Sequence, residues 1–516
     1  MKKNLYIIGA LALSVLTTSC KDDFLDTKPS QQLSPEQIKT AAETDPSLLK
    51  GFMAGIYSNM YNTGTGGTTG HDDFGQKGYD IYTDMLSSDM VLAGTNYGWY
   101  TTLARYQATT NYTLNDAYQP WRYYYQIIFS ANTLIEILGG NDAVQEEVDR
   151  QYVMGQAKAM RAYGYFYLAN LYAKGYGTGS EAILPIYTDT TVPAQPLSTS
   201  AQVYEQIIKD LEEAITLLDG FERGAKNEIN QSVAKGLLVY ALSARGTTED
   251  LQRVVTLTDE IITSGEYAML TPNQVVAQFD ADGKITNRES AGFNDVASPS
   301  WMWGVDLTLD INLDLVSWWG QVDLFTYSYA WAGDPKVIDA SLYNAIPSDD
   351  YRKGQFYEPY DLMPINKFYA PDRVKGGQRN VVTDYVYMRI EEMVLLNAEA
   401  NARLGNDAEA KAMLAMLMEQ RRREVAGSEA TTGADAYEDY LATLSGDALL
   451  DEVFLQTRIE LWGEGKTYLA LKRLKKSITR GENHLFLAGQ TFGWEDDEMT
   501  FPIPQAELLN NPALYQ

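Results

Sequence analysis

Apolar side chains recur with helical spacing over much of the chain. Within 203–218 they fall three or four residues apart, which places them along one face of a helix. Ser200 is a suitable N-cap for this helix, and Gly220 follows its expected end. The same spacing predicts further helices over 116–138, 146–173, 231–244, 249–264, 385–404, 408–425 and 451–475.

Glycines separate most of these predicted helices. Consecutive helices joined by short turns favour stacked helix pairs like those of tetratricopeptide (TPR) arrays, although no repeat of fixed period is visible. We therefore expect a mainly α protein of TPR-like helix pairs. Two long stretches, 61–112 and 274–383, interrupt the pattern and are rich in Gly, Asp, Pro and aromatic residues. Loops of this length are uncommon and often functional, and their aromatic content argues against disorder.

The N-terminus has the pattern of a lipoprotein signal. Lys2 and Lys3 precede an apolar run over 5–16 that is too short to span a bilayer as a helix. A Thr-Thr-Ser stretch then leads to Cys20, as in bacterial lipoprotein signals, in which the cysteine thiol takes a diacylglycerol and cleavage on its N-terminal side makes it the mature N-terminus. Ordinary secretory cleavage beside an incidental cysteine is the alternative. We expect three segments: a signal peptide over 1–19, a lipidated tether over 20–34 and a single domain over 35–516.

Composition narrows the possible chemistry. Among 516 residues, 41 Lys and Arg stand against 69 Asp and Glu, which gives a formal net charge of −28. Because this charge repels phosphate backbones and anionic headgroups, binding to nucleic acid is disfavoured and a neutral or cationic ligand fits better. One cysteine and two histidines exclude an internal disulfide and leave little for a zinc site or a histidine-based triad. We therefore expect no metal and no cofactor, and much common catalysis is disfavoured, whereas 69 acidic residues leave carboxylate pairs for glycoside hydrolysis open.

Three short motifs carry weak signals. GEGKT at 463–467 resembles the end of a phosphate-binding loop, but Glu460 stands where that motif needs glycine, and a helix is expected where it needs a strand. His71 beside two aspartates could ligate a cation, yet adjacent residues rarely converge on one ion. The three arginines at 421–423 come late in a predicted amphipathic helix, where solvated or paired cations are the ordinary outcome.

Aromatic residues concentrate in the two long loop stretches. Five of the nine tryptophans lie within 301–331, interleaved with aspartates. Because indole is bulky and seeks a partner for its N–H, this pattern indicates a surface that meets a ligand, although filling the core beneath the loops is the alternative for any single ring. Trp301 and Trp303 alternate as in a strand and favour the core. The candidate ligand-binding residues are Asn96, Tyr97, Trp99, Tyr100, Trp318, Trp319, Tyr327, Tyr329 and Trp331.

Several segments carry a resemblance that covers essentially the whole chain. The N-terminal half contains, in order, CKDDFLDTKPS, WRYYYQIIFSANTLIE, GQAKAMRAYGYFYLANLYAKGYG and VYEQIIKDLEEAITLL. The C-terminal half contains SDDYR, TDYVYMRIEEMVLLNAEANARLG, IELWGEGKTYLALKRL and TFPIPQAELLNNPALYQ. Each motif alone is weak, but in this order and spacing they resemble the signatures of the SusD/RagB family.

The resemblance implies a lipoprotein of the Bacteroidetes outer membrane with a SusD-like fold, in which a helical TPR-like scaffold holds a loop-rich binding region. Members of this family are not enzymes; they bind oligosaccharides, or peptides in one branch, as lids of SusC-like TonB-dependent transporters. Sugar rings present apolar faces that stack on Trp and Tyr, while amides such as that of Asn96 both donate to and accept from hydroxyls. A peptide cargo, a helical secreted glycosidase and a scaffold without small ligand are the alternatives.

Three expectations rest on this resemblance. Cys20 carries the lipid, and the charged run over 21–23 marks the chain for the cell exterior. The helical face, rather than the aromatic loops, docks on the transporter, because TPR-like pairs expose broad surfaces. The ligand lies between the loop stretches 61–112 and 274–383.

Overall fold

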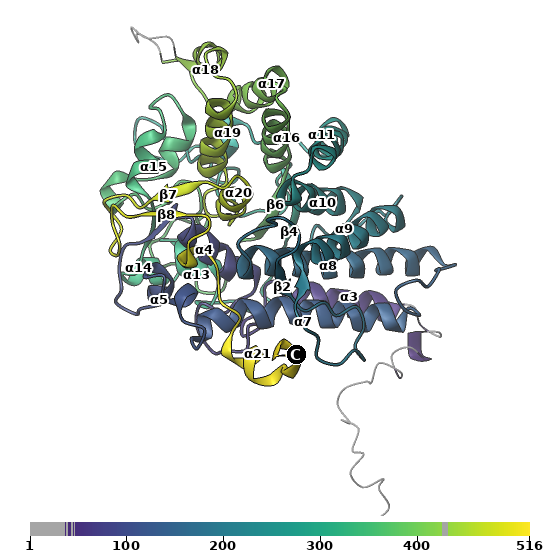
Figure 1. Ribbon diagram of the computed structural model, residues 1–516. Helices are drawn as coiled ribbons and strands as arrows, with labels where there is room; N and C mark the ends of the chain where they lie inside the picture. Colours follow the sequence, from purple (N-terminus) through teal and green to yellow (C-terminus); the bar gives the residue numbers. More distant parts are fainter. Residues whose placement is uncertain (1–36, 38–39, 43–44, 46, 426–431, 516) are drawn as a thin grey trace, which may run out of the picture.

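A continuous stack of long helices forms one side of the molecule (Figure 1). The computed structural model describes residues 37, 40–42, 45, 47–425 and 432–515, so Cys20 and the segments predicted over 1–19 and 20–34 lie outside it. α8 packs between α7 and α9, and α10 packs between α9 and α11. The bounds are α7 Asn115–Ile137, α8 Val148–Tyr172, α9 Ser200–Leu217, α10 Gln231–Arg245 and α11 Thr248–Thr263.

A second group of helices continues the stack. α16 packs on α11, on α17 and on α19, and α18 packs on α17. Their bounds are α16 Ile390–Leu404, α17 Asp407–Met418, α18 Gly433–Ala442 and α19 Asp447–Glu460. Neighbouring helices thus pair as in TPR arrays, and the prediction of a mainly α, TPR-like scaffold is confirmed.

The structure corrects four predicted boundaries. α9 takes Thr199 rather than Ser200 as its N-cap, in a capping box with Gln202. The segment 385–404 begins as a strand before α16, and α17 ends at Met418 because the chain then turns to pair with residues 349–351. The segment 451–475 is two helices, α19 and α20 (Thr467–Arg473), since Gly463 and Gly465 between them take positive φ angles of 82° and 74°.

The strands form short antiparallel pairs. The pair that matters for the site joins β1 (Met90–Leu92) to β5 (Lys336–Ile338) and so brings the two loop stretches together. β4 pairs with β6, and both are buried, which confirms the prediction of a core strand at Trp301 and Trp303. The remaining bounds are β2 Ala182–Leu184, β3 Ser198–Thr199, β4 Trp301–Val305, β6 Tyr385–Arg389, β7 Ser477–Thr479 and β8 Thr491–Gly493.

The loop stretches also contain helices. α4 (Gln76–Leu86) is buried along its whole length, although its sequence is too polar to predict a core helix. Figure 1 shows α13, α14 and α15 on the side opposite the long helices. The other helices are α3 Ser47–Ser58, α5 Thr101–Ala104, α6 Gln107–Thr110, α12 Pro272–Val275, α13 Trp318–Val322, α14 Tyr329–Ala332, α15 Ala340–Ala345, α21 Gln505–Asn510, and the 3₁₀ turns Tyr351–Gln355, Glu358–Tyr360, Asp497–Met499 and Pro512–Tyr515.

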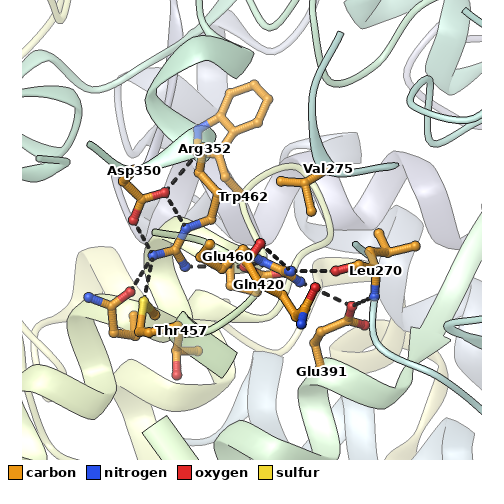
Figure 2. Close-up of polar contacts among 12 residues, drawn as sticks. Leu270, Val275, Asp350, Arg352, Glu391, Gln420, Thr457, Glu460 and Trp462 are labelled. Atoms are coloured by element: carbon orange, nitrogen blue, oxygen red, sulfur yellow. Dashed lines mark hydrogen bonds and ion pairs between the residues drawn. The ribbon is translucent and has the colours of Figure 1, made fainter. Parts of the chain in front are cut away.

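A buried ion cluster connects the loop stretch 274–383 to the helices. Figure 2 shows Arg352 between Asp350 and Glu460, with N–O distances of 2.7 and 3.1 Å. Four cations and four carboxylates take part, so the charges balance. The members of the ion cluster are Arg352, Lys367, Arg389, Arg421, Asp350, Glu391, Glu460 and Glu464.

The ion cluster accounts for two of the motifs. Glu464 lies in GEGKT and binds Arg389 and Lys367, so the glycines beside it shape a turn that carries a buried carboxylate. Arg421 is fully buried and pairs with Glu460 and Glu391. The predicted pairing of the three arginines is confirmed for Arg421. This residue lies beyond the end of α17, not within the helix that the sequence predicted.

Candidate ligand-binding site

The β1–β5 pair sets the position of the candidate site. Leu92 lies opposite Lys336, and the next bond joins the N–H of Ala93 to the carbonyl of Pro335 at 2.9 Å. From this point the chain after β1 runs through 96–99, and the chain before β5 runs through 327–334. Both segments therefore emerge side by side at one end of the same two-stranded ladder.

Asp334 holds the first segment in place. Its carboxylate is fully buried and accepts the backbone N–H groups of Asn96, Tyr97 and Gly98, the last two at 2.9 and 3.2 Å. Asn96 donates from Nδ2 to the carbonyl of Ala332 at 3.3 Å. Charge-assisted bonds of this kind are stronger than neutral ones, so the carboxylate fixes the conformation of the loop that carries Tyr97.

Aromatic rings from both segments converge here. Trp99 stacks on His71 with ring centroids 5.0 Å apart and planes within 3°. Tyr329 meets the rings of His71, Tyr97 and Trp99 edge-on, with centroids 5.8, 5.1 and 6.3 Å away. These edge-to-face and stacked arrangements are the ones that aromatic quadrupoles favour.

Three rings of the group are open to solvent. Tyr97 is 60% exposed, Trp331 is 41% exposed and Tyr327 is 37% exposed. Tyr327 lies 5.6 Å from Trp331, and the guanidinium of Arg379 lies 3.9 Å from the centroid of the Tyr327 ring. The aromatic site comprises two ring groups that adjoin in the chain: His71, Tyr97, Trp99 and Tyr329, and the pair Tyr327 and Trp331.

A series of hydrogen bonds supports the rings of Tyr329 and His71 on their buried side. The hydroxyl of Tyr329 and Nδ1 of His71 lie 2.5 Å apart, and Gln321 donates to the carbonyl of His71 at 2.6 Å. The ammonium of Lys336 donates to the side-chain oxygen of Gln321 at 2.7 Å. Burial lowers the pKa of Lys336 to about 7, although the nearby carboxylate of Asp334 opposes that shift.

The structure brings together six of the nine predicted ligand-binding residues and separates the other three. Asn96, Tyr97, Trp99, Tyr327, Tyr329 and Trp331 lie in or beside the aromatic site, and Tyr329 is itself largely covered. Tyr100, Trp318 and Trp319 are 2%, 1% and 1% exposed, so the prediction that they contact ligand is wrong in this structure.

These three rings serve the core instead. Trp318 packs against Trp319 and Phe368, with centroid distances of 5.3 and 4.4 Å. Tyr100 packs on Tyr82 at 5.7 Å. The adjacent tryptophans thus fill space beneath the loop, which was the alternative interpretation of the pattern. The core role predicted for Trp303 is confirmed by its 2% exposure.

Several residues of the site were not predicted as ligand-binding residues from the sequence. His71 follows a glycine-rich run, and nothing in that run indicates that its ring stacks on Trp99. Asp334 and Arg379 are two charged residues among many, and their roles depend on contacts with residues far away in the chain. Only the three-dimensional contacts of these residues place them at the site.

The arrangement suits recognition of a ligand with flat apolar faces and polar edges. Exposed Tyr97 follows Asn96 in the chain, and the guanidinium of Arg379 stacks on the ring of exposed Tyr327. Within the described ranges, no three His, Cys, Asp or Glu side chains gather as a metal site would require. Over the same residues, no helix combines the length with the hydropathy that a bilayer crossing demands.

Comparisons with known proteins agree on one family. A family model described as starch-binding and associating with the outer membrane matches residues 23–240, and the SusD family model matches residues 324–516. A SusD-like protein of Formosa agariphila is 26% identical over 436 residues, which cover 77% of this chain and 79% of that protein.

Solved structures share the fold. A SusD-like carbohydrate binding protein from Bacteroides vulgatus matches with a TM-score of 0.70 at 23% identity, covering 90% of this chain and 96% of that one. Surface glycan-binding protein A from Bacteroides uniformis matches with a TM-score of 0.62 at 18% identity, covering 91% and 98%. The fold is that of the SusD superfamily. With both halves matched by models of the same family, the chain belongs to the SusD/RagB family.

Proposed function

We propose that this chain binds a glycan, whose sugar rings stack on the exposed rings of the aromatic site. The observation that carries the proposal is the presence of two ring groups at one end of the β1–β5 ladder, one holding exposed Tyr97 against Tyr329 and the other holding exposed Tyr327 and Trp331. Sugar rings have apolar C–H faces and polar edges, which match ring faces bordered by an amide and a guanidinium. Two similar structures are described as carbohydrate- or glycan-binding, which supports the same ligand class.

Affinity electrophoresis against soluble starch, xylan, galactomannan and homogalacturonan tests the proposal. Trp331→Ala and Trp99→Ala should each weaken retention of the polysaccharide that the wild type binds. Losing a good aromatic anchor typically costs about 2 kcal/mol, which corresponds to roughly a 30-fold rise in Kd by titration calorimetry. Tyr112→Ala is the matched control, because Tyr112 is 45% exposed but lies outside the aromatic site.

The same assays separate the other functions. Retention of peptides with no polysaccharide binding would assign the aromatic site to a peptide cargo. Release of reducing ends from a bound polysaccharide would indicate a glycosidase, whereas we expect binding without hydrolysis. If Trp99→Ala and Trp331→Ala both fold normally and bind as the wild type does, the aromatic site is not where the ligand lies.

We further infer that the chain acts at the cell exterior as the lid of a SusC-like TonB-dependent transporter. The family model that matches 23–240 is described as associating with the outer membrane, and Cys20 has the sequence context of a lipid attachment site. In this proposal 1–19 is a signal peptide and 20–34 a tether for the domain over 35–516. The helical face of α7–α11 docks on the transporter and leaves the aromatic site free.

Gentle detergent extraction of native outer membranes tests the partner. Co-purification of a much larger barrel protein is the expected result, and isolation of the chain alone would contradict it. Trp331→Ala should leave co-purification unchanged, because the docking face and the ligand site are separate in this proposal.

A further inference from the structure

A second group of exposed rings lines a cleft that the proposed glycan site does not include. The cleft has a volume of about 750 Å³ and is lined by segments 276–279 and 343–366 and by Arg423. Phe279 and Tyr357 in its wall are 47% and 41% exposed, and neighbouring Tyr360 is 41% exposed. The rings of Tyr357 and Tyr360 lie 5.8 Å apart.

A continuous run of contacts joins this cleft to the aromatic site. Trp331 packs so closely on Gly376 that a Cβ atom there would lie 3.1 Å from the indole ring. The next side chain along the surface is Lys375, whose ammonium lies 5.9 Å from the centroid of the Tyr360 ring. The path therefore runs from Trp331 past Gly376 and Lys375 to Tyr360 and the cleft.

The backbone fixes both ends of this path. Gly376 and Gly377 donate their N–H groups to the carbonyls of Leu324 and Phe325, each at 3.0 Å. At the other end, Tyr357 donates its N–H to the carbonyl of Met363 at 3.0 Å, which closes a tight turn. The exposed rings are thus presented on held segments, so binding them would immobilise little further chain.

Polar groups accompany the rings in the cleft. The hydroxyl of Tyr343 donates to the Glu358 carboxylate at 3.0 Å, and Lys353 donates to the carbonyl of Ile346 at 2.8 Å. Asn366 donates to the carbonyl of Gly354 at 3.0 Å. Like the aromatic site, the cleft therefore combines exposed rings with amide, carboxylate and ammonium groups that can bond to hydroxyls.

The cleft also lies away from α7 and α8. Tyr343 belongs to α15, and Trp331 belongs to α14; Figure 1 shows both helices on the side opposite α7 and α8. A partner that covers the helical face leaves both ring groups open together.

We propose that this cleft is a second glycan subsite, which binds a further stretch of the same oligosaccharide whose first rings stack in the aromatic site. The inference rests on the proposed function. A polymer with repeated ring faces can occupy two ring-bearing surfaces joined by one path. Because the second contact is then intramolecular, affinity rises once the oligosaccharide is long enough to reach both surfaces.

Titration calorimetry with oligosaccharide ladders of increasing length tests the inference, using ladders cut from soluble starch, xylan, galactomannan and homogalacturonan. For the wild type, we expect a step in affinity of about tenfold or more as length increases. The double variant Tyr357→Ala and Tyr360→Ala should bind short oligosaccharides as the wild type does and lose that step. Tyr112→Ala, another exposed tyrosine, should keep it.

The outcomes distinguish the subsite from the proposed function. Wild-type affinity that does not rise with length, or a double variant that retains the step with native melting, overturns the subsite alone. Trp331→Ala should instead weaken binding at every length. Binding of none of the four ladders, or an unchanged Trp331→Ala, overturns the proposed function and the subsite with it. Hydrogen-exchange protection of 357–363 by long but not short oligosaccharides supports the subsite independently.

Discussion

Glu460 offers the sharpest test of how the loop stretch 274–383 is held on the scaffold. Its carboxylate is 3% exposed and accepts from Arg352 at 3.1 Å, from Arg389 at 2.7 Å and from Arg421 at 2.8 Å. Burial alone would raise the pKa of Glu460, but the guanidiniums of Arg421 and Arg389 outweigh it and hold the pKa well below its usual range. Glu460→Gln keeps the shape and removes the charge.

The expected loss follows from the remaining partners. Removing one partner of a buried ion pair typically destabilises a protein by about 3–5 kcal/mol. After the substitution, Arg352 keeps Asp350, Arg389 keeps Glu464 and Arg421 keeps Glu391, so we expect the lower end, about 3 kcal/mol. At about 2 cal/mol/K per residue, unfolding of a chain this long has an entropy of about 1 kcal/mol/K, so Tm should fall by about 3 °C.

Thermal unfolding by calorimetry across pH measures this loss. A carboxyl whose folded pKa is depressed stabilises the protein above its unfolded pKa, and this contribution disappears as pH falls through the folded pKa. The gap between wild type and Glu460→Gln should therefore be full at pH 7 and shrink below about pH 4.5. Glu205→Gln, at an exposed position, is the control and should leave Tm unchanged. Equal Tm of Glu460→Gln and wild type at pH 7, or a difference in Tm that stays constant as pH falls, would refute the reasoning.

Four further predictions concern single residues. Trp318→Ala should lower the unfolding free energy by about 3–5 kcal/mol by leaving a cavity, whereas Trp331→Ala should barely change Tm; similar melting of both would show that Trp318 is not a core ring. Asp334→Asn keeps one acceptor oxygen for the three N–H groups of 96–98, so glycan affinity should fall at least about tenfold by calorimetry, and unchanged affinity would contradict this support. Neither carboxylate oxygen of Asp84 has a hydrogen-bond partner within the described residues, and burial raises the pKa of this group. The contribution of Asp84 to the unfolding free energy should therefore decline as pH rises above about 4. Asp84→Asn should remove this contribution, so the difference between variant and wild type in urea unfolding should change with pH, and a constant difference would contradict the prediction. Cys20→Ala should release the protein from the outer-membrane fraction, and continued fractionation with that membrane would refute lipid anchoring.

The sequence by itself determined the scaffold. Amphipathic spacing over 116–138, 146–173, 231–244 and 249–264 predicted α7, α8, α10 and α11 to within about two residues, because a long apolar stripe with one period leaves a helix few alternatives. The family, too, followed from the order of its motifs. Apolar runs without a clear period were less informative. The five residues of β6 were therefore predicted, wrongly, as the first residues of the helix α16.

Only the tertiary structure decided which aromatic residues face solvent. Trp318 and Trp331 lie in the same stretch and have the same chemistry, yet one is 1% exposed and the other 41%. Exposure depends on what packs over a ring, and here the covering residue, Phe368, is distant in sequence. The meeting of 96–99 with 327–334 depends likewise on a β1–β5 ladder of three residue pairs, whose strands are too short and too far apart in the chain for any local pattern to predict their pairing.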